Sequence, residues 1–154
     1  MDPRPILLVE DNPDDVDLTL RALRKNDIMN DVIVARDGRE ALMRLFGEGG
    51  SSRDQNIQRP SVVLLDLKLP HVDGFEVLRQ MRANESTRLI PVIILTSSKE
   101  ELDLLKGYRL GANSYVRKPV DYDQFLMTVQ ELGQYWLTLN EPVHDKGVDI
   151  WEDR

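Results

Sequence analysis

The chain of 154 residues contains no cysteine, which excludes a disulfide framework and a thiolate site. It also lacks any apolar run that approaches the roughly 20 residues of a membrane-spanning helix. Its first residues do not have the pattern of a secretory signal. These absences are typical of a cytoplasmic protein, and we expect no membrane partner.

Basic residues are in the minority. The 20 Lys and Arg stand against 27 Asp and Glu, which gives a net charge of −7. No basic patch stands out, although a protein that binds DNA needs one to displace counterions from the phosphate backbone. We therefore expect no nucleic acid partner. The hydrophobic share of 41% is sufficient for the core of one domain of this length.

Short apolar runs alternate with amphipathic stretches along the whole chain. The apolar runs predict strands at roughly 5–10, 32–35, 62–65, 92–95 and 114–116. The amphipathic stretches and their start and stop signals predict helices at 13–26, after Asp37, near 74–83, between Ser98 and Gly111, and at about 121–139. This order predicts an α/β fold with a doubly wound, five-stranded parallel sheet.

Several of these apolar runs end directly in polar residues. Glu10 and Asp11 follow the first run, Asp66 follows the third, and Thr96 follows the fourth. Because open α/β sheets hold their ligands at the carboxyl ends of the strands, we expect these side chains at one rim. Two carboxylates about 4 Å apart repel by roughly 4 kcal/mol at an effective dielectric near 20. A hard cation with oxygen ligands would relieve this repulsion, and Mg²⁺ is the usual one beside phosphate.

Taken singly, these residues have simpler interpretations. Asp66 could merely cap the next helix, and Glu10 and Asp11 could merely favour the positive end of the helix that follows them. Thr96 alone fits an ordinary strand residue, and Lys118 alone fits a solvated surface charge. Their convergence on one rim favours a functional interpretation of the whole set.

These features resemble the receiver domain of two-component response regulators over about residues 4–130. The match includes Lys118-Pro119 after the fifth run, and Pro70 and Gly74 in the turn after Asp66. The resemblance implies a flavodoxin-like receiver fold with strand order 2-1-3-4-5, and a cis bond between Lys118 and Pro119. It also implies that a sensor histidine kinase is the partner and that Mg²⁺ is the cofactor.

The resemblance also implies the roles of the acidic residues. Asp66 would be the phosphoacceptor, and its nucleophilic attack would give an acyl phosphate. Glu10, Asp11, Asp66 and the backbone carbonyl of Lys68 would bind the metal ion. Such a chain is a phosphoacceptor signalling protein rather than an enzyme, although it promotes its own phosphotransfer and autodephosphorylation.

Two further residues would contact the phosphoryl group, and a third would respond to it. Lys118 would contribute a point charge, and Thr96 a hydroxyl donor. Tyr115 matches the aromatic switch position of the family, so Thr96 and Tyr115 together would form the switch. We expect the switch to act on the face made by the fourth helix, the fifth strand and the fifth helix. The alternative is that Tyr115 is a fixed, half-exposed strand residue.

Two softer features resemble the stand-alone regulators associated with phytochrome kinases. One is the long polar loop at 47–60, and the other is the extended last helix, which ends in Gln134-Tyr135-Trp136-Leu137. We therefore expect a receiver domain at 1–139, an acidic C-terminal tail at 140–154, and a phytochrome as the kinase.

The sequence also bears on three other functions. A phosphohydrolase with an aspartyl phosphate would carry a carboxylate two residues after its nucleophile, where this chain has Lys68. A nucleotide-binding protein would carry a glycine-rich turn after the first strand, where this chain is acidic. An unphosphorylated pseudo-receiver scaffold, which acts only by binding other proteins, remains the alternative.

The last predicted helix also suggests a homodimer. Leu126, Gly133 and Leu137 form a second stripe beside the one that would dock the helix on its own sheet. An apolar stripe left over on a projecting helix would be an interaction surface for a second copy. The alternative is that this stripe packs under the tail, against Ile150 and Trp151.

Overall fold

The computed structural model describes residues 4–47 and 59–143 of the chain. Most of the loop expected at 47–60 and most of the tail expected at 140–154 lie outside these ranges. Strands and helices alternate as the sequence predicts. Their bounds are β1 (Ile6–Val9), α1 (Pro13–Lys25), β2 (Val32–Ala35), α2 (Gly38–Phe46), β3 (Val62–Leu65), α3 (Gly74–Ala83), β4 (Val92–Thr96), α4 (Glu101–Arg109), β5 (Ser114–Arg117), α5 (Tyr122–Gln134) and η2 (Tyr135–Leu139).

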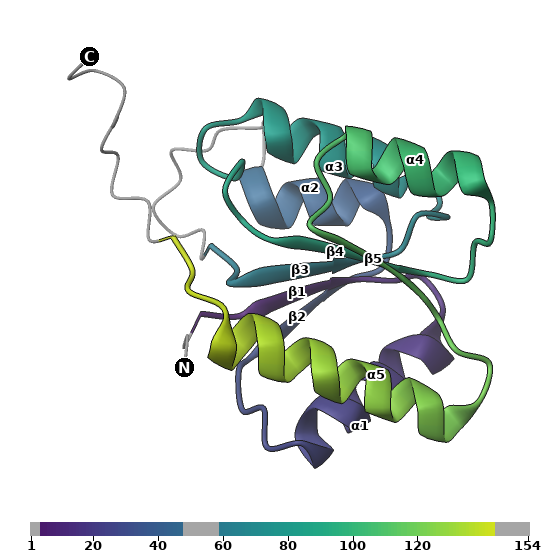
Figure 1. The fold of residues 1–154 in the computed structure, drawn as a ribbon. Helices are drawn as coiled ribbons and strands as arrows, with labels where there is room; N and C mark the ends of the chain where they lie inside the picture. Colours follow the sequence, from purple (N-terminus) through teal and green to yellow (C-terminus); the bar gives the residue numbers. More distant parts are fainter. Residues whose placement is uncertain (1–3, 48–58, 144–154) are drawn as a thin grey trace.

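The five strands form one parallel sheet in the order β2-β1-β3-β4-β5. Helices α2, α3 and α4 cover one face of the sheet, and α1 and α5 cover the other (Figure 1). The predicted doubly wound, flavodoxin-like fold with strand order 2-1-3-4-5 is therefore confirmed. Within the two described ranges, no helix is both long enough and apolar enough to cross a membrane.

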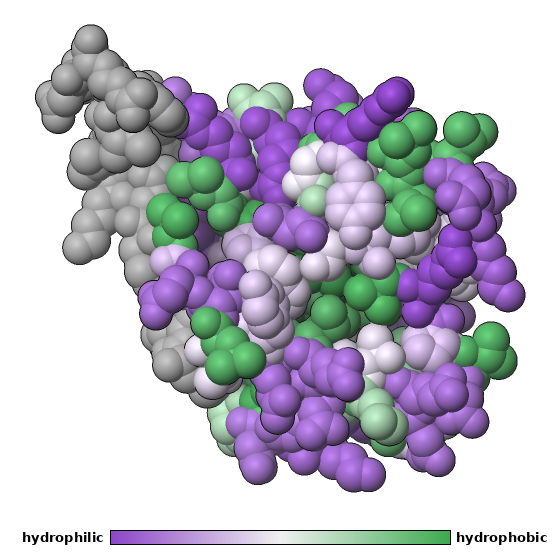
Figure 2. Space-filling model, viewed as in Figure 1, coloured by the Kyte–Doolittle hydropathy of each residue, from purple (hydrophilic) through white to green (hydrophobic). Residues whose placement is uncertain are grey.

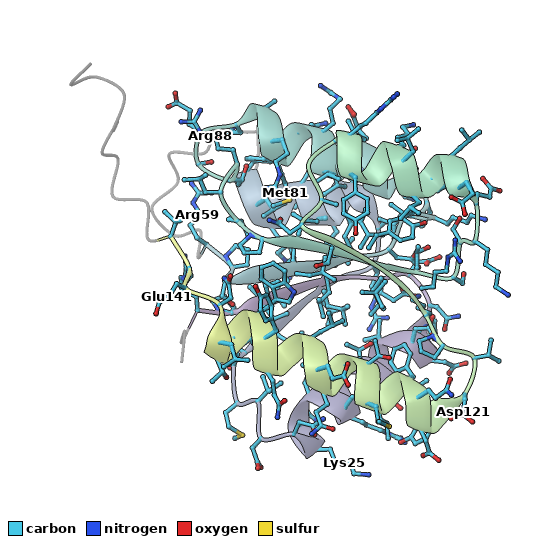
Figure 3. The ribbon with its side chains drawn as sticks, in the orientation of Figure 1. Lys25, Arg59, Met81, Arg88, Asp121 and Glu141 are labelled. Carbon is cyan, nitrogen blue, oxygen red and sulfur yellow. The ribbon has the colours of Figure 1, made fainter. Side chains whose placement is uncertain are left out.

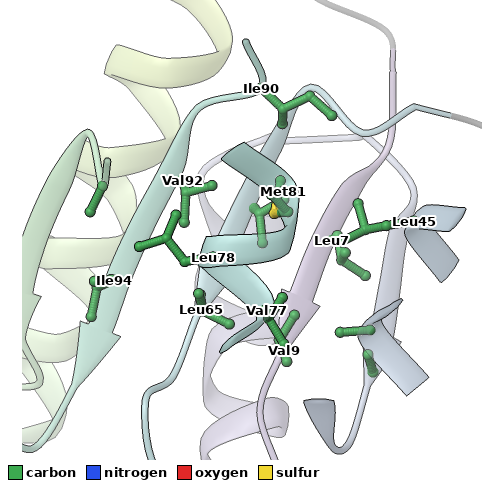
Figure 4. Close-up of a cluster of buried hydrophobic side chains, with 14 of the residues drawn as sticks. Leu7, Val9, Leu45, Leu65, Val77, Leu78, Met81, Ile90, Val92 and Ile94 are labelled. Atoms are coloured by element: carbon green, nitrogen blue, oxygen red, sulfur yellow. The ribbon is translucent and has the colours of Figure 1, made fainter. Parts of the chain in front are cut away.

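The core explains why the strands are continuous apolar runs. Successive residues of a strand point to opposite faces, so a strand with helices on both faces must be apolar throughout. In β1, Leu7 and Val9 join the cluster that includes α2 and α3, whereas Ile6 and Leu8 join the cluster that includes α1 and α5. Figure 4 shows the first cluster, with Met81 directed from α3 toward the sheet. The strands are thus fixed on both faces beneath the rim.

Side-chain caps fix the points where the helices begin. The Oδ1 of Asn12 accepts hydrogen bonds from the amides of Asp14 (2.9 Å) and Asp15 (3.3 Å) at the start of α1. Asp121, labelled at the start of α5 in Figure 3, accepts one from the amide of Gln124 at 3.0 Å. The N-terminal turn of α1 is therefore held directly beside the end of β1, where the predicted site lies.

Helix α4 does not begin as the sequence predicts. Ser98 was expected to start it, but α4 begins at Glu101, after an N-cap residue, Glu100, whose side chain forms no capping hydrogen bond. The hydroxyl of Ser98 donates instead to Oδ2 of Asp103 at 2.6 Å, because a charged acceptor makes a stronger hydrogen bond than a neutral one. The predicted stop is confirmed, since Gly111 follows the end of α4 with φ of +100°.

The last helix ends where the sequence predicts, but its second apolar stripe is not exposed to solvent. Helix α5 continues into the π-helical segment η2, which ends at Leu139. Leu126, Gly133 and Leu137 are all buried. A Cβ at Gly133 would lie only 2.1 Å from Cδ1 of Ile28, so the helix is packed closely against the segment after α1.

The basis of the predicted homodimer is therefore wrong. A docked amphipathic helix buries an apolar face at least about 100° wide, and this face takes in both stripes of α5. The homodimer itself stays a prediction, but without this stripe as its interface. The alternative contacts with Ile150 and Trp151 concern residues outside the described ranges.

Candidate functional site

Backbone hydrogen bonds continue the sheet pairing past the strand ends and so align the site. The amide of Asp66, just after β3, donates to the carbonyl of Val9 at 3.0 Å. The amide of Lys118, just after β5, donates to the carbonyl of Thr96 at 2.8 Å. Glu10 directly follows Val9. These side chains therefore emerge from neighbouring strands at the carboxyl edge of the sheet, as the sequence predicts.

Glu10, Asp11 and Asp66 form a cluster that we call the acidic triad. Each residue offers a carboxylate oxygen, and these oxygens all lie within 4.8 Å of one another. Glu10 is 3% exposed and Asp66 is 9% exposed, whereas Asp11 is open to solvent. The triad is thus a largely buried set of oxygen ligands with one side facing the solvent.

Lys118 reaches into the triad from β5. Its Nζ lies 3.0 Å from Oε2 of Glu10 and 3.1 Å from Oδ2 of Asp66. It also lies 2.8 Å from Oδ2 of Asp15, a residue that the sequence analysis did not assign to the site. The predicted cis bond between Lys118 and Pro119 is wrong, since no peptide bond in the described residues is cis. The trans form is the lower in energy for a bond before proline, by about 0.5–1 kcal/mol.

The site distributes its charges unequally. Burial, followed by the hydrogen bond and the charge of Asp66, raises the pKa of Glu10 to about 9, although Lys118 opposes this shift. Burial would also raise the pKa of Asp66, but its hydrogen bond with Glu10 and the charge of Lys118 lower it. Burial would lower the pKa of Lys118, yet Asp15, Asp66 and Glu10 raise it. At neutral pH, Glu10 is therefore protonated, while Asp66 and Lys118 are charged.

The loop after β3 holds the carboxylate of Asp66 in one orientation. The amide of Leu67 donates to Oδ1 of Asp66 at 2.7 Å. A Cβ at Gly74 would lie 2.3 Å from the carbonyl oxygen of Asp66, so only glycine allows α3 to begin this close to the loop. Lys68 lies on the same loop with its side chain exposed.

A second group of polar residues leads from the site toward α4. Thr96 is fully buried at the end of β4, and its hydroxyl accepts a hydrogen bond from the amide of Ser98 at 3.3 Å. Ser98 in turn donates to Asp103 of α4. The hydroxyl of Tyr115 is buried nearby without a hydrogen-bond partner. The two predicted switch residues therefore lie on adjacent strands, with Ser98 between Thr96 and α4.

The acidic triad fits a divalent cation. Two of its three carboxyl groups are buried, and close carboxylates are unfavourable unless a proton or a cation lies among them. In the protein alone a proton on Glu10 fulfils this role, because burial and the neighbouring Asp66 raise the pKa of Glu10. The ligand atoms are all carboxylate oxygens, which hard ions such as Mg²⁺ and Ca²⁺ prefer.

Comparison with known proteins places the chain in a family. Residues 6–130 match the family described as the response regulator receiver domain. The chain is 43% identical over 141 residues to the probable methanogenesis regulatory protein FilR2 of Methanothrix harundinacea (strain 6Ac), covering 90% of this chain and 87% of FilR2. It is 37% identical over 135 residues to the response regulator Rcp1 of Synechocystis sp., covering 88% of this chain and 90% of Rcp1.

Solved structures of similar proteins share the fold. The phosphorylated cyanobacterial phytochrome response regulator RcpA is 34% identical with a TM-score of 0.84, and 93% of this chain and 100% of that chain are covered. The Mn²⁺-bound form of Rcp1 is 35% identical with a TM-score of 0.84, and 92% of this chain and 100% of the Rcp1 chain are covered. The bacteriophytochrome response regulator AtBRR is 52% identical with a TM-score of 0.68, and 92% of this chain and 100% of the AtBRR chain are covered. The chain therefore belongs to the response regulator receiver domain family, and it is similar to response regulators of phytochromes.

Proposed function

We propose that this protein is a response regulator that accepts a phosphoryl group on Asp66 from a sensor histidine kinase, with Mg²⁺ as the metal ion. The contact between Nζ of Lys118 and Oδ2 of Asp66 at 3.1 Å, inside the acidic triad, carries this proposal. A buried, ionised carboxylate beside a fixed cation is suited to attack a phosphoryl group. The similarity of the chain to RcpA, a phytochrome response regulator, and to AtBRR, a bacteriophytochrome response regulator, supports a phytochrome as the kinase.

The groups of the site have complementary roles in this reaction. An oxygen of the Asp66 carboxylate forms a bond to phosphorus while the bond from phosphorus to the imidazole nitrogen of the donor breaks. The amide of Leu67 holds the carboxylate in place through Oδ1. Lys118 donates to one phosphoryl oxygen and the hydroxyl of Thr96 to another. When bound, Mg²⁺ supplies positive charge that offsets the negative charge of the carboxylates and the phosphoryl group.

The protein would act on itself rather than on a separate substrate. It promotes its own phosphorylation, and water later hydrolyses the acyl phosphate. An unphosphorylated pseudo-receiver scaffold would require neither the acidic triad nor Lys118. Since the triad and Lys118 lie together at the rim, nothing in the described part of the chain favours that alternative.

A small phosphoryl donor tests the proposal without the kinase. Incubation with acetyl phosphate and MgCl₂ should add one phosphoryl group, which intact-mass spectrometry detects. The product should be cleaved by hydroxylamine, as an acyl phosphate is, and EDTA should prevent its formation. An unchanged mass, or labelling that is insensitive to EDTA, would contradict the proposal. Transfer from an autophosphorylated phytochrome kinase, compared with an unrelated histidine kinase, tests the partner.

The proposal extends to a switch on the face formed by α4, β5 and α5. If Thr96 turns toward a phosphoryl group, it leaves space behind it that the ring of Tyr115 can enter. The same movement displaces the segment that holds Ser98 and therefore its hydrogen bond to α4. Leu102 and Leu105 of α4 are exposed, and Figure 2 shows apolar side chains over this helix. A partner could therefore sense the change on this face.

Phosphorylation should change the surroundings of Tyr115 because its hydroxyl is buried without a partner in the unphosphorylated protein. Chemical shifts of ¹³C-labelled tyrosine rings, recorded before and after phosphorylation, measure this change. Tyr135 of η2 is half exposed and provides an internal control. Identical Tyr115 signals in the two states would refute the switch while leaving phosphorylation of Asp66 unaffected.

A further inference from the structure

Lys118 has one more carboxylate partner than the proposed reaction requires. An ammonium group has three N–H donors, and Nζ of Lys118 is within 3.1 Å of three different carboxyl groups. The shortest of these contacts, at 2.8 Å, is with Asp15, which is not part of the acidic triad. The donors of Lys118 are therefore all in use before any phosphoryl group arrives.

Helix α1 holds Asp15 firmly in this position. Asp15 is the third residue of α1, and its amide donates to Oδ1 of Asn12 at 3.3 Å. Its carbonyl accepts the hydroxyl of Thr19 at 2.8 Å, one turn further along. The positive end of the helix also favours a carboxylate at this place. By contrast, Asp14 lies one residue earlier in the same turn with the same charge, and its side chain is exposed.

The three carboxyl groups differ in what a metal ion would do to them. Glu10 and Asp66 belong to the acidic triad, so a bound divalent cation would draw on their oxygens. Asp15 lies outside the triad and would keep its full attraction for Lys118. The N–H groups of Lys118 that no longer donate to Glu10 and Asp66 could then donate to a phosphoryl oxygen, while the contact with Asp15 stays in place.

We propose that Asp15 is a positioning residue whose carboxylate anchors the ammonium of Lys118 beside Asp66, so that its other donors can turn to the phosphoryl group. This inference rests on the proposed function. The anchor acts through Lys118 and touches neither phosphorus nor the attacking oxygen. Its removal should therefore slow phosphotransfer without preventing it.

Asparagine is the appropriate replacement because it preserves shape. The side chains around Lys118 line a small pocket of about 10 Å³, formed by Glu10, Asp15, Thr19, Asp66 and Lys118 among others. This volume is close to the minimum for one water molecule, so truncation to alanine would let solvent into the site. Asp15→Asn removes the charge and keeps the volume. Asp15→Glu restores the charge on a longer side chain, and Asp14→Asn is the matched control.

The experiment compares these variants with the wild type in the acetyl phosphate reaction at saturating Mg²⁺. We expect the rate constant of Asp15→Asn to fall about three- to tenfold, with partial recovery in Asp15→Glu and no change in Asp14→Asn. The ¹⁵N signal of the Lys118 ammonium group is a second readout that does not depend on phosphorylation. It should be sharp in the wild type and broadened in Asp15→Asn, because protons of an unanchored ammonium exchange faster with water.

The outcomes separate this inference from the function on which it rests. If the wild type is labelled and Asp15→Asn is labelled equally fast or faster, the inference fails and the proposed function stands. An ammonium signal unaffected by Asp15→Asn would also overturn it. A slower rate that Asp15→Glu does not recover at all would indicate a structural effect and count against the inference. A wild type that is never labelled would overturn the proposed function and this inference with it.

Discussion

Replacing Asp66 with asparagine is expected to abolish phosphorylation and to leave the fold intact. An amide has nearly the same shape as a carboxylate, and its oxygen can still accept the hydrogen bond that the Leu67 amide donates to Oδ1 at 2.7 Å. The amide is, however, a poor nucleophile and cannot give an acyl phosphate. Intact-mass spectrometry after incubation with acetyl phosphate and MgCl₂ should therefore show label in the wild type and none in Asp66→Asn.

The matched control for this variant is Asp73→Asn. Asp73 lies on the loop after Asp66 and caps α3 by accepting a hydrogen bond from the amide of Glu76 at 3.0 Å. Asparagine caps helices about as well as aspartate, so this change removes a neighbouring carboxylate at little structural cost. Asp73→Asn should be labelled like the wild type. Label that persists in Asp66→Asn would show that another residue accepts the phosphoryl group.

Much of this site could be predicted because its residues directly follow apolar runs. In a parallel sheet the carboxyl ends of the strands meet at one edge, so a polar residue just after each run must reach that edge. Glu10, Asp66 and Thr96 are residues of this kind, and the structure brings them together. The prediction required only the order of the elements and not their packing.

Asp15 could not be found by the same reasoning. It lies in the first turn of α1, where attraction to the helix dipole already explains an acidic residue. Its contact with Lys118 joins residues 103 positions apart and depends on how α1 packs against the sheet. A count of the three donors of Lys118 against its one predicted contact, the phosphoryl group, would have left two donors unassigned, but it would not have identified their acceptors.

The last helix shows a different limit of sequence patterns. The spacing of Leu126, Gly133 and Leu137 predicts which side of α5 is apolar, but it does not predict how much of that side the domain covers. How much of the helix is covered depends on the close approach of Ile28 to Gly133, and this contact is set by the tertiary structure and not by the spacing of residues along α5. Because Leu137 is only 2% exposed, a charged substitution there would disrupt the core and could not serve as a test of dimerisation.

The affinity of the acidic triad for Mg²⁺ is expected to rise steeply with pH. In the protein without metal the pKa of Glu10 is about 9, because burial disfavours its charge and Asp66 lies beside it. Below that pH the proton on Glu10 competes with the cation, so raising the pH removes the competitor and strengthens binding. Asp66, whose pKa is lowered, is already ionised and adds nothing to this dependence. The dissociation constant should fall about tenfold per pH unit between about pH 6 and pH 8, and level off above about pH 9.

Isothermal titration calorimetry with MgCl₂ in two buffers of different ionisation enthalpy measures this linkage directly. Binding should release about one proton per Mg²⁺ at about pH 7, about half a proton at about pH 9 and almost none above about pH 10. The Glu10→Gln variant, which has no proton to lose at this position, should bind Mg²⁺ more weakly and with an affinity that hardly changes with pH. Lys118 stays charged across this range because its neighbours raise its pKa, so it cannot supply the proton. If the wild type binds Mg²⁺ without releasing a proton, the assignment of the proton to Glu10 is wrong. If Glu10→Gln still releases a proton, that proton belongs to another carboxyl group of the site.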